Sequence, residues 1–244
     1  MSLFDDLSDY FNAHINSEHL KYLEGRGVSS ASIEEFSIGM FPDRINKLFD
    51  NFDPVQLRES GMIFNSTRSR FSNHTLLFPI RDFAGKVIAF TGRTLMSDSE
   101  RKKEGITKYT HTPYEKTKNV YNINLAIPHM RSSDYVLVVE GQLDVILAHQ
   151  RGVKNIIAVG NSTLSSNRLL SISKYCTRII VLFDNDEAGE SGVAKLSQYS
   201  KWSHGIDLYY AFLPKSYHDM GDFIVENDKE KLLTHIKNSI KKVC

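Results

Sequence analysis

The second half of the chain alternates short apolar runs with amphipathic segments. Four continuous apolar runs have the length of strands that are buried on both faces: 135–140, 155–160, 178–184 and 206–214. Three segments with helical spacing lie between them: 143–152, 165–175 and 186–199. Strands that alternate with helices predict an α/β fold with a parallel sheet and right-handed crossovers. Binding residues on such a sheet belong at the carboxyl ends of the strands.

The first half of the chain has a different pattern. Residues 17–41 predict two short helices separated by Gly25 and Gly27, and residues 73–95 predict a hairpin that turns at "DFAG". Residues 97–119 are polar and rich in lysine, which indicates either a mobile loop or a binding segment. We therefore predict three parts: a smaller mixed α+β subdomain, an α/β domain and a C-terminal helix that packs on the core, at 1–125, 126–225 and 226–244.

Composition and charge narrow the class of protein. The formal net charge of the 244 residues is only +1, so a contact with nucleic acid would need a local basic patch. Cys176 and Cys244 are the two cysteines and form no CxxC pair, so we expect no zinc in this chain and a reducing compartment. The acidic N-terminal sequence lacks a signal peptide, and no apolar run approaches 18 residues. These features predict a cytoplasmic protein with no membrane association.

Acidic residues follow the predicted strands of the second half. They form three pairs: Glu140 with Asp144, Asp184 with Asp186, and Asp219 with Asp222. Two like charges at the end of a buried strand repel, and a structural role explains them poorly unless a cation lies between them. Hard divalent cations prefer carboxylate oxygens, and two such ions can serve phosphoryl transfer. One aspartate at a helix start is usually a cap, but three pairs on one sheet predict a metal site.

The order of these acidic motifs resembles the Toprim fold. The resemblance rests on E-G-x-x-D at 140–144, D-x-D-x-A-G at 184–189 and the later acidic pair. That fold is shared by bacterial-type primases, topoisomerases and some nucleases. A topoisomerase also needs a nucleophilic tyrosine on a separate domain, for which we expect no room in this chain.

Three segments of the first half are similar to motifs of DnaG-type primases. They read "YLEGRGVSSASIEEFSIGMFP", "RFSNHTLLFPIRDFAGKVIAFTGRTL" and "KYTHTPYEKTKNVYNINLA". Together with the Toprim motifs, the resemblance covers about residues 20–225. It implies a primase catalytic core: a Toprim-type parallel sheet flanked by helices, preceded by the smaller mixed subdomain.

The resemblance also implies an activity and its residues. The activity is nucleotidyl transfer with two Mg²⁺ or Mn²⁺ ions, which makes short primers, expected to be RNA, from nucleoside triphosphates on single-stranded DNA. Glu140, Asp184 and Asp186 are implied as the catalytic metal carboxylates, supported by the other three acidic residues. Candidate contacts to nucleotide and template are basic residues and a tyrosine that could stack on a base: Arg26, Arg70, Arg93, Lys108, Tyr109, Lys116 and Lys118.

The chain departs from the family's pattern in several respects. We expect neither the usual zinc-ribbon domain nor a helicase-binding domain in this chain, and therefore a separate zinc-domain protein and a replicative helicase as partners, in a bacterial cell or a phage-infected host. His111 stands where the family has asparagine, and the last acidic motif is D-x-x-D rather than D-P-D. Two alternatives remain open: a metal-dependent Toprim nuclease, and a non-catalytic protein that binds nucleic acid or a helicase.

Overall fold

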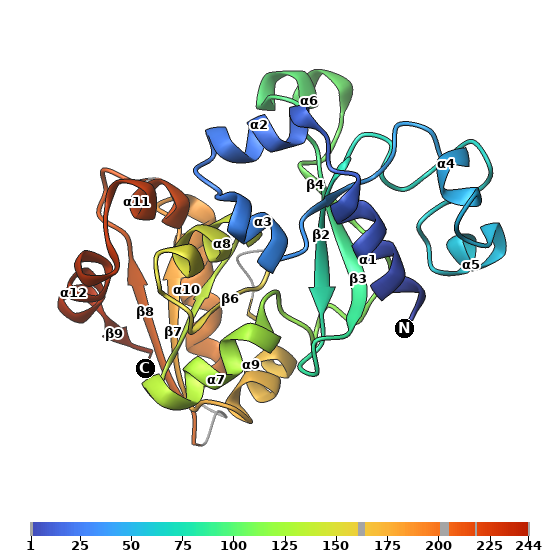
Figure 1. Cartoon of the computed structure of the whole chain (residues 1–244). Helices are drawn as coiled ribbons and strands as arrows, with labels where there is room; N and C mark the ends of the chain where they lie inside the picture. Colours follow the sequence, from blue (N-terminus) through green and yellow to red (C-terminus); the bar gives the residue numbers. More distant parts are fainter. Residues whose placement is uncertain (1, 161–163, 201–204, 218, 244) are drawn as a thin grey trace. The chain divides into compact units, whose positions relative to one another are not determined.

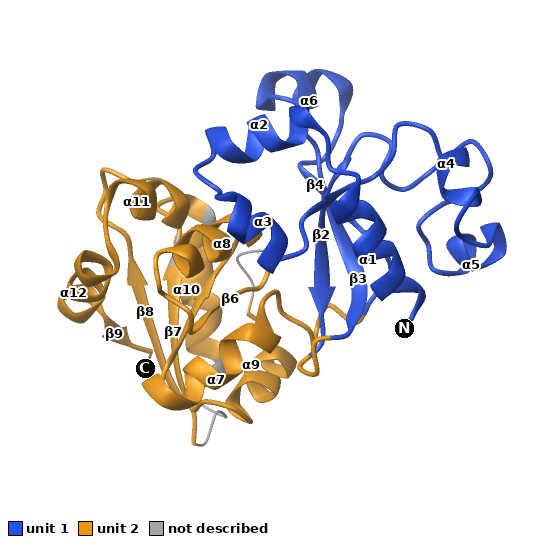
Figure 2. Cartoon of the chain, in the orientation of Figure 1, with its two compact units in different colours: residues 1–82, 86–114 blue, residues 83–85, 115–244 orange. Residues whose placement is uncertain are grey.

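The fold is described from a computed structural model that covers residues 2–160, 164–200, 205–217 and 219–243. The chain divides into two compact units, each described by itself (Figure 2). Unit 1 comprises Met1–Asp82 and Lys86–Tyr114, and unit 2 comprises Phe83–Gly85 and Glu115–Cys244. Within the described residues, no helix is both long enough and apolar enough to cross a bilayer.

Unit 1 is built on an antiparallel sheet with the order β1-β2-β3-β4 (Figure 1). Its strands are β1 (Gly39–Met40), β2 (Leu76–Arg81), β3 (Val87–Arg93) and β4 (Tyr109–His111). β2 and β3 form the hairpin expected from the sequence, in which Leu76 pairs with Arg93 and Ile80 with Ala89. β4 pairs with the last residues of β3, so that Tyr109 lies opposite Arg93.

The helices of unit 1 cover this sheet and its loops. They are α1 (Leu3–Ala13), α2 (Ser17–Gly25), α3 (Ser30–Glu35), α4 (Asn46–Phe49), α5 (Pro54–Glu59) and α6 (Asp98–Glu104). The two short helices expected between 17 and 41 are confirmed as α2 and α3. The polar stretch 97–119 is not one continuous loop, because it contains α6 and β4. α6 begins at a capping box in which Ser97 and Glu100 satisfy each other's backbone N–H groups.

Unit 2 holds the parallel sheet, with the order β6-β5-β7-β8-β9 (Figure 1). Its strands are β5 (Val136–Val139), β6 (Ile156–Ala158), β7 (Arg178–Phe183), β8 (Asp207–Phe212) and β9 (Lys241–Lys242). β5 to β8 run parallel, which confirms the predicted α/β class beside a smaller mixed subdomain. β9 runs antiparallel to β8 at one edge of the sheet, an element that was not predicted from the sequence.

Helices flank the sheet of unit 2. They are α7 (Ile123–Ser133), α8 (Gln142–Gln150), α9 (Ser166–Ser173), α10 (Glu187–Ser200), α11 (Met220–Glu226) and α12 (Lys229–Ser239). The core is formed by strand residues such as Val136, Val138 and Val181, together with Leu169 and Ile172 of α9. The expected C-terminal helix corresponds to α12, which buries Leu232 and Ile236, but the chain then continues into β9.

Candidate active site

Arg93, the last residue of β3, is buried between two tyrosine rings of unit 1. Its side chain is 7% exposed, and its Cζ atom lies 5.6 Å from the ring centre of Tyr22 and 5.3 Å from that of Tyr109. Nη1 donates a hydrogen bond to the Tyr109 hydroxyl, whereas Nε has no partner among the described residues. Burial acts to lower the pKa of Arg93, but the hydroxyls of Tyr109 and Tyr22 outweigh it and raise the pKa. The cluster therefore holds a permanent cation whose buried Nε–H has no partner among the described residues.

The sheet register explains why these residues meet. Arg93 and Tyr109 are cross-strand partners in β3 and β4, and the backbone carbonyl of Lys108 accepts a hydrogen bond of 3.2 Å from Thr94. Tyr22 comes from α2 and was not among the residues singled out from the sequence, although it opens the "YLEGRG" motif. Arg26 follows the end of the same helix with an exposed side chain. Of the candidates in unit 1, the described contacts join Arg93 with Tyr109.

Arg70 takes part in a different arrangement of unit 1. Its Nε donates to the backbone carbonyl of Gly61 at 2.8 Å, and its Cζ lies 5.0 Å from the ring centre of Phe64. These contacts hold the loop between residues 61 and 70. No described contact links Arg70 to the tyrosines around Arg93.

Asp144 is the centre of the acidic group in unit 2. It lies in the first turn of α8, where Oδ1 accepts the Gly221 N–H at 2.9 Å and Oδ2 accepts the Gly141 N–H at 3.1 Å. Burial, followed by the charges of Asp219 and Asp184, raises the pKa of Asp144 to about 7 despite these two hydrogen bonds. A Cβ at position 141 would overlap Asp144 Oδ2, so any residue other than glycine would require the Asp144 carboxylate to move.

The remaining acidic residues surround Asp144 at the carboxyl ends of the strands. Glu140 follows β5 with its Oε1 atom buried and without a hydrogen-bond partner. Burial, then the charges of Asp186 and Asp144, raise the pKa of Glu140. Asp186 accepts the Gly189 N–H at 2.8 Å at the start of α10. The described residues therefore hold carboxylates that disfavour each other's ionisation, which is costly unless a ligand compensates.

The last acidic pair has unequal roles. Asp219 is the N-cap of α11 and accepts the backbone N–H of Asp222 at 2.8 Å, whereas the Asp222 side chain is exposed. Because Asp219 also contributes to the raised pKa of Asp144, Asp219 is the member of the pair that faces the acidic group.

Asn185, between the two aspartates of the D-N-D motif, fixes the loop after β7. Its Nδ2 lies within hydrogen-bond distance of three backbone carbonyls: Leu213 at 3.1 Å, Pro214 at 3.1 Å and Tyr217 at 2.9 Å. No local sequence pattern indicates this role, because the acceptors are backbone atoms 28 to 32 residues away.

The donor set fits a hard divalent cation, since it consists of carboxylate oxygens and includes the orphaned Oε1 of Glu140. Within the described residues, however, no three acidic, histidine or cysteine side chains converge tightly enough to enclose a metal ion. Mg²⁺ commonly uses one or two carboxylates and completes its shell with waters and substrate phosphates. The group therefore suits metals that arrive together with a phosphate-bearing substrate.

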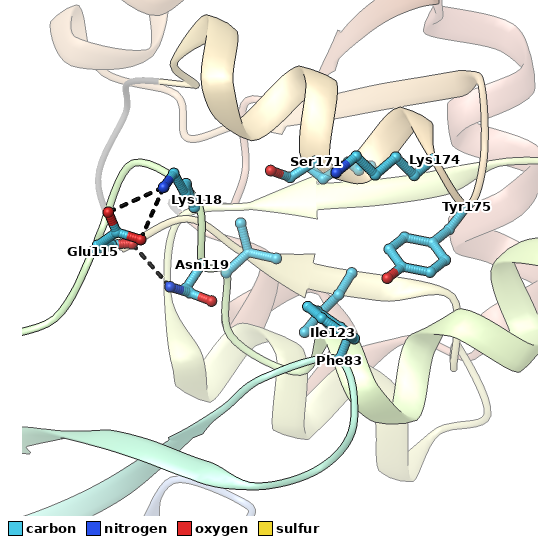
Figure 3. Close-up of a pocket in the computed structure, with 10 residues that line it drawn as sticks. Phe83, Glu115, Lys118, Asn119, Ile123, Ser171, Lys174 and Tyr175 are labelled. Atoms are coloured by element: carbon cyan, nitrogen blue, oxygen red, sulfur yellow. Dashed lines mark hydrogen bonds and ion pairs between the residues drawn. The ribbon is translucent and has the colours of Figure 1, made fainter.

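Lys116 and Lys118 precede α7 in unit 2. The backbone carbonyl of Lys116 accepts a 2.7 Å hydrogen bond from Nε of Arg168, and burial, followed by the charge of Arg168, lowers the pKa of Lys116. Lys118 pairs with Glu115 at 3.1 Å at the edge of a cavity of about 250 Å³ (Figure 3). Arg168, which was missed from the sequence, thus positions the segment that carries both lysines.

Two family models match most of the chain. The family described as "DNA primase catalytic core, N-terminal domain" matches residues 8–127, and the Toprim domain matches residues 134–212. The DNA primase of Clostridium acetobutylicum is 27% identical over 241 residues, which cover 94% of this chain and 39% of the relative. The chain thus spans about two fifths of the length of such curated relatives.

Solved structures agree with these matches. A DNA primase domain from Pseudomonas aeruginosa superposes with a TM-score of 0.85 at 25% identity, covering 98% of this chain and 78% of that one. A DnaG primase catalytic domain bound to single-stranded DNA gives a TM-score of 0.81 at 25% identity, covering 97% and 80%.

Proposed function

Because the chain belongs to the family of DnaG-type primase catalytic cores, with the N-terminal core domain followed by a Toprim domain, we propose that it synthesises short primers on single-stranded DNA. The reaction is nucleotidyl transfer: a 3′-hydroxyl attacks the α-phosphate of a nucleoside triphosphate and pyrophosphate leaves. We further propose ribonucleotides as the preferred substrates.

The observation that carries this proposal is the crowding of Asp144 with Glu140, Asp184 and Asp219. Burial and neighbouring negative charge raise the pKa of Asp144 to about 7, so the apo protein bears a cost that a bound cation would relieve. A protein that only bound nucleic acid would gain nothing from such a cost. This argument supports catalysis over the non-catalytic alternative.

The metal ligands we propose are Glu140, Asp184 and Asp186, with Asp144, Asp219 and Asp222 in support. When bound, Mg²⁺ or Mn²⁺ would supply activation of the attacking oxygen and neutralisation of the leaving group. Asp144 itself acts as a positioning residue, since its two oxygens already accept the N–H groups of Gly141 and Gly221.

The cations have separate tasks in this proposal. Arg93 stabilises negative charge on the triphosphate with its permanent cation, and Lys108 and Lys116 assist. Arg26, Arg70, Tyr109 and Lys118 contact nucleotide or template. Residues 1–125 would then bind template and nucleotide, residues 126–225 would carry the metal chemistry, and residues 226–244 would support the fold.

Further partners belong to the same proposal. Template selection and delivery would involve a replicative helicase and a zinc-domain protein encoded separately, in the cytoplasm of a bacterium or of a phage-infected host. Adding such proteins should change where primers start without changing which carboxylates are essential.

The test is a primer-synthesis assay with single-stranded DNA, labelled ribonucleoside triphosphates and Mg²⁺ or Mn²⁺. We expect short labelled products from the wild type and none from D184A/D186A, with both proteins equally folded by circular dichroism. D43A is the matched control, because the Asp43 side chain is 68% exposed in unit 1 and is no part of the acidic group, and it should retain most activity. Template degradation without added nucleotides would favour the nuclease instead, and equal synthesis by D184A/D186A would disprove the site.

A further inference from the structure

A cavity in unit 2 is distinct from the acidic group around Asp144. It has a volume of about 250 Å³ and is lined by the segment that leads into α7, by the end of α9 and by Phe83 (Figure 3). The residues described as lining it include none of the six carboxylates of the acidic group. Small-molecule sites occupy roughly 300–1,000 Å³, so this cavity suits one small ligand and is too small for an oligonucleotide.

The apolar part of the lining is continuous with the core of unit 2. Val120, Ile123 and Ile172 are each at most 7% exposed and belong to that core. The half-buried Tyr175 and the exposed Phe83 add two aromatic rings. An apolar cavity with two rings favours a ligand that has a flat ring of its own.

Phe83 is held on a tight turn, although its side chain is 65% exposed. The Asp82 N–H donates to the Lys86 carbonyl at 2.9 Å, and the Lys86 N–H donates to Asp82 Oδ1 at 3.0 Å. Gly85 completes the turn with a φ of +88°. A ligand in the cavity would cover part of this ring without first having to order the turn that carries it.

One positive charge at the cavity is available to a ligand. Lys118 and Glu115 pair with each other at 3.1 Å, so their charges cancel. Lys174 is exposed and forms no ion pair within the described residues. Figure 3 shows Lys174 and Ser171 on the side of the cavity opposite Phe83. The ammonium and hydroxyl groups can therefore bind an anionic group of a ligand.

A hydrogen-bond acceptor at the cavity is also available. Asn119 Nδ2 donates to the backbone carbonyl of Glu115 at 3.0 Å, whereas its Oδ1 accepts no hydrogen bond within the described residues. Figure 3 shows this oxygen directed away from Glu115. Because the amide is fixed through its nitrogen, its oxygen selects a ligand that carries an N–H donor.

We infer that this cavity binds a free nucleoside monophosphate whose base carries an amino group, as adenosine monophosphate (AMP) does. The base packs against Phe83 and Tyr175, its amino group donates to Asn119 Oδ1, and the phosphate accepts hydrogen bonds from Lys174 and Ser171. A single ammonium matches one phosphate better than three. The ligand therefore differs from the triphosphate substrates of the proposed reaction, and the inference does not depend on that reaction.

A bound nucleotide would join two segments that already contact each other. Arg168 of α9 donates to the Lys116 carbonyl at 2.7 Å, and a ligand between Asn119 and Lys174 would add a second connection. Hydrogen exchange can therefore locate the site. We expect AMP to slow amide exchange in the segments that line the cavity, at 115–123 and 170–175.

Affinity is measured by isothermal titration calorimetry in EDTA, so that no metal-dependent binding contributes. We expect inosine monophosphate, which has a carbonyl in place of the amino group, to bind at least about tenfold more weakly than AMP. K174Q should weaken AMP binding by about tenfold or more, because it removes a charge-assisted contact. F83A should weaken it by roughly three- to tenfold, the effect of one lost ring contact.

Two matched variants control for changes of the same kind elsewhere. K237Q removes an exposed lysine of α12 in unit 2, and F64A removes a ring in unit 1 that is 49% exposed. Neither residue lines the cavity. Both variants should bind AMP with wild-type affinity.

The outcomes separate this inference from the proposed function. Wild-type AMP affinity in D184A/D186A together with weak binding by K174Q supports the cavity even if no primer is ever made. The inference is overturned, even if primer synthesis is confirmed, by any of three results: no AMP binding in EDTA, loss of AMP binding in D184A/D186A, or wild-type affinity in both K174Q and F83A.

Discussion

The two units solve the problem of buried charge in opposite ways. In unit 1, Arg93 is one cation among neutral tyrosines, which stack on it and accept its hydrogen bond. In unit 2, Asp144 is buried next to other carboxylates, and the N–H groups of Gly141 and Gly221 compensate it incompletely. The Arg93 cluster is stable without a ligand, whereas the acidic group around Asp144 is stabilised by a bound cation. The Arg93 cation is therefore preorganised, whereas the buried carboxylates of unit 2 lower the stability of the protein when no ligand is bound.

The largest expected effect is a pH dependence caused by Asp144. The pKa of about 7 in the folded state exceeds the usual 3.8, so the folded protein binds more protons than the unfolded chain between these values. This contribution to stability is complete below pH 3.8 and is lost as the pH rises through 7. It amounts to at most about 4 kcal/mol.

Urea unfolding in EDTA across pH 5 to 8 would measure this contribution. D144N, which cannot ionise at position 144, should show a shallower decline, because only Glu140 then keeps a raised pKa. Comparing the slopes avoids the constant offset caused by the hydrogen-bond acceptor that D144N loses. Adding Mg²⁺ at pH 8 should recover part of the lost stability in the wild type and none in D144N. If the free energies of unfolding of the wild type and D144N changed in parallel with pH, the pKa of Asp144 would not be raised.

Removing the preorganised cation should have the next largest effect. R93A leaves a void between two rings and removes a buried hydrogen bond, so we expect a loss of about 2–4 kcal/mol in the free energy of unfolding. R93K should recover little, because an ammonium cannot stack as a planar guanidinium does. Chemical denaturation measures both. R26A, at an exposed position, should change stability by less than about 0.5 kcal/mol, and an equal loss in R26A would contradict the special role of Arg93.

Replacing Asn185, whose amide holds the loop after β7 in unit 2, should have an intermediate effect on stability. N185A loses an amide that bonds to the Leu213, Pro214 and Tyr217 carbonyls, which should cost about 1–3 kcal/mol. N185D should be at least as destabilising, since its carboxylate would face three carbonyl oxygens. Thermal melting would rank the two variants. A melting temperature of N185D equal to that of the wild type would show that the hydrogen bonds of the Asn185 amide are dispensable.

The smallest effect is expected at Lys118. Its pair with Glu115 is exposed, with 58% of the lysine side chain and 68% of the glutamate side chain accessible. K118A should therefore change stability by less than about 0.5 kcal/mol. If K118A lowers primer synthesis by more than this small change in stability can explain, Lys118 contacts the substrate. E115Q serves as the control, because it breaks the same pair and leaves the lysine in place.

The elements that could be predicted from the sequence are those with the strongest apolar pattern. β5 and β6 are entirely buried and β8 is half-buried, and the order of β5 to β8 along the chain could be predicted from hydrophobicity alone. β9 consists of two exposed lysines that are held by pairing with β8, so its residues carry no apolar signal. α6 is different: its capping box at Ser97 is readable in the sequence, and we overlooked it in favour of the lysine content.

The same distinction applies to the candidate site. Glu140 and Asp184 could be selected because they directly follow recognisable strands. Tyr22, Asn185 and Arg168 act through partners 28 to 71 residues away, so only the folded chain assigns their roles. Local patterns predict which residues lie at strand ends, but not which distant backbone atoms hold them there.

The fit between Gly141 and Asp144 also constrains how the sequence can drift. Alanine at 141 would displace the carboxylate of Asp144, so this substitution costs less in a background where position 144 already carries a shorter side chain. The two changes are therefore less costly in one order than in the other. A lineage that loses this glycine is expected to have given up the aspartate first.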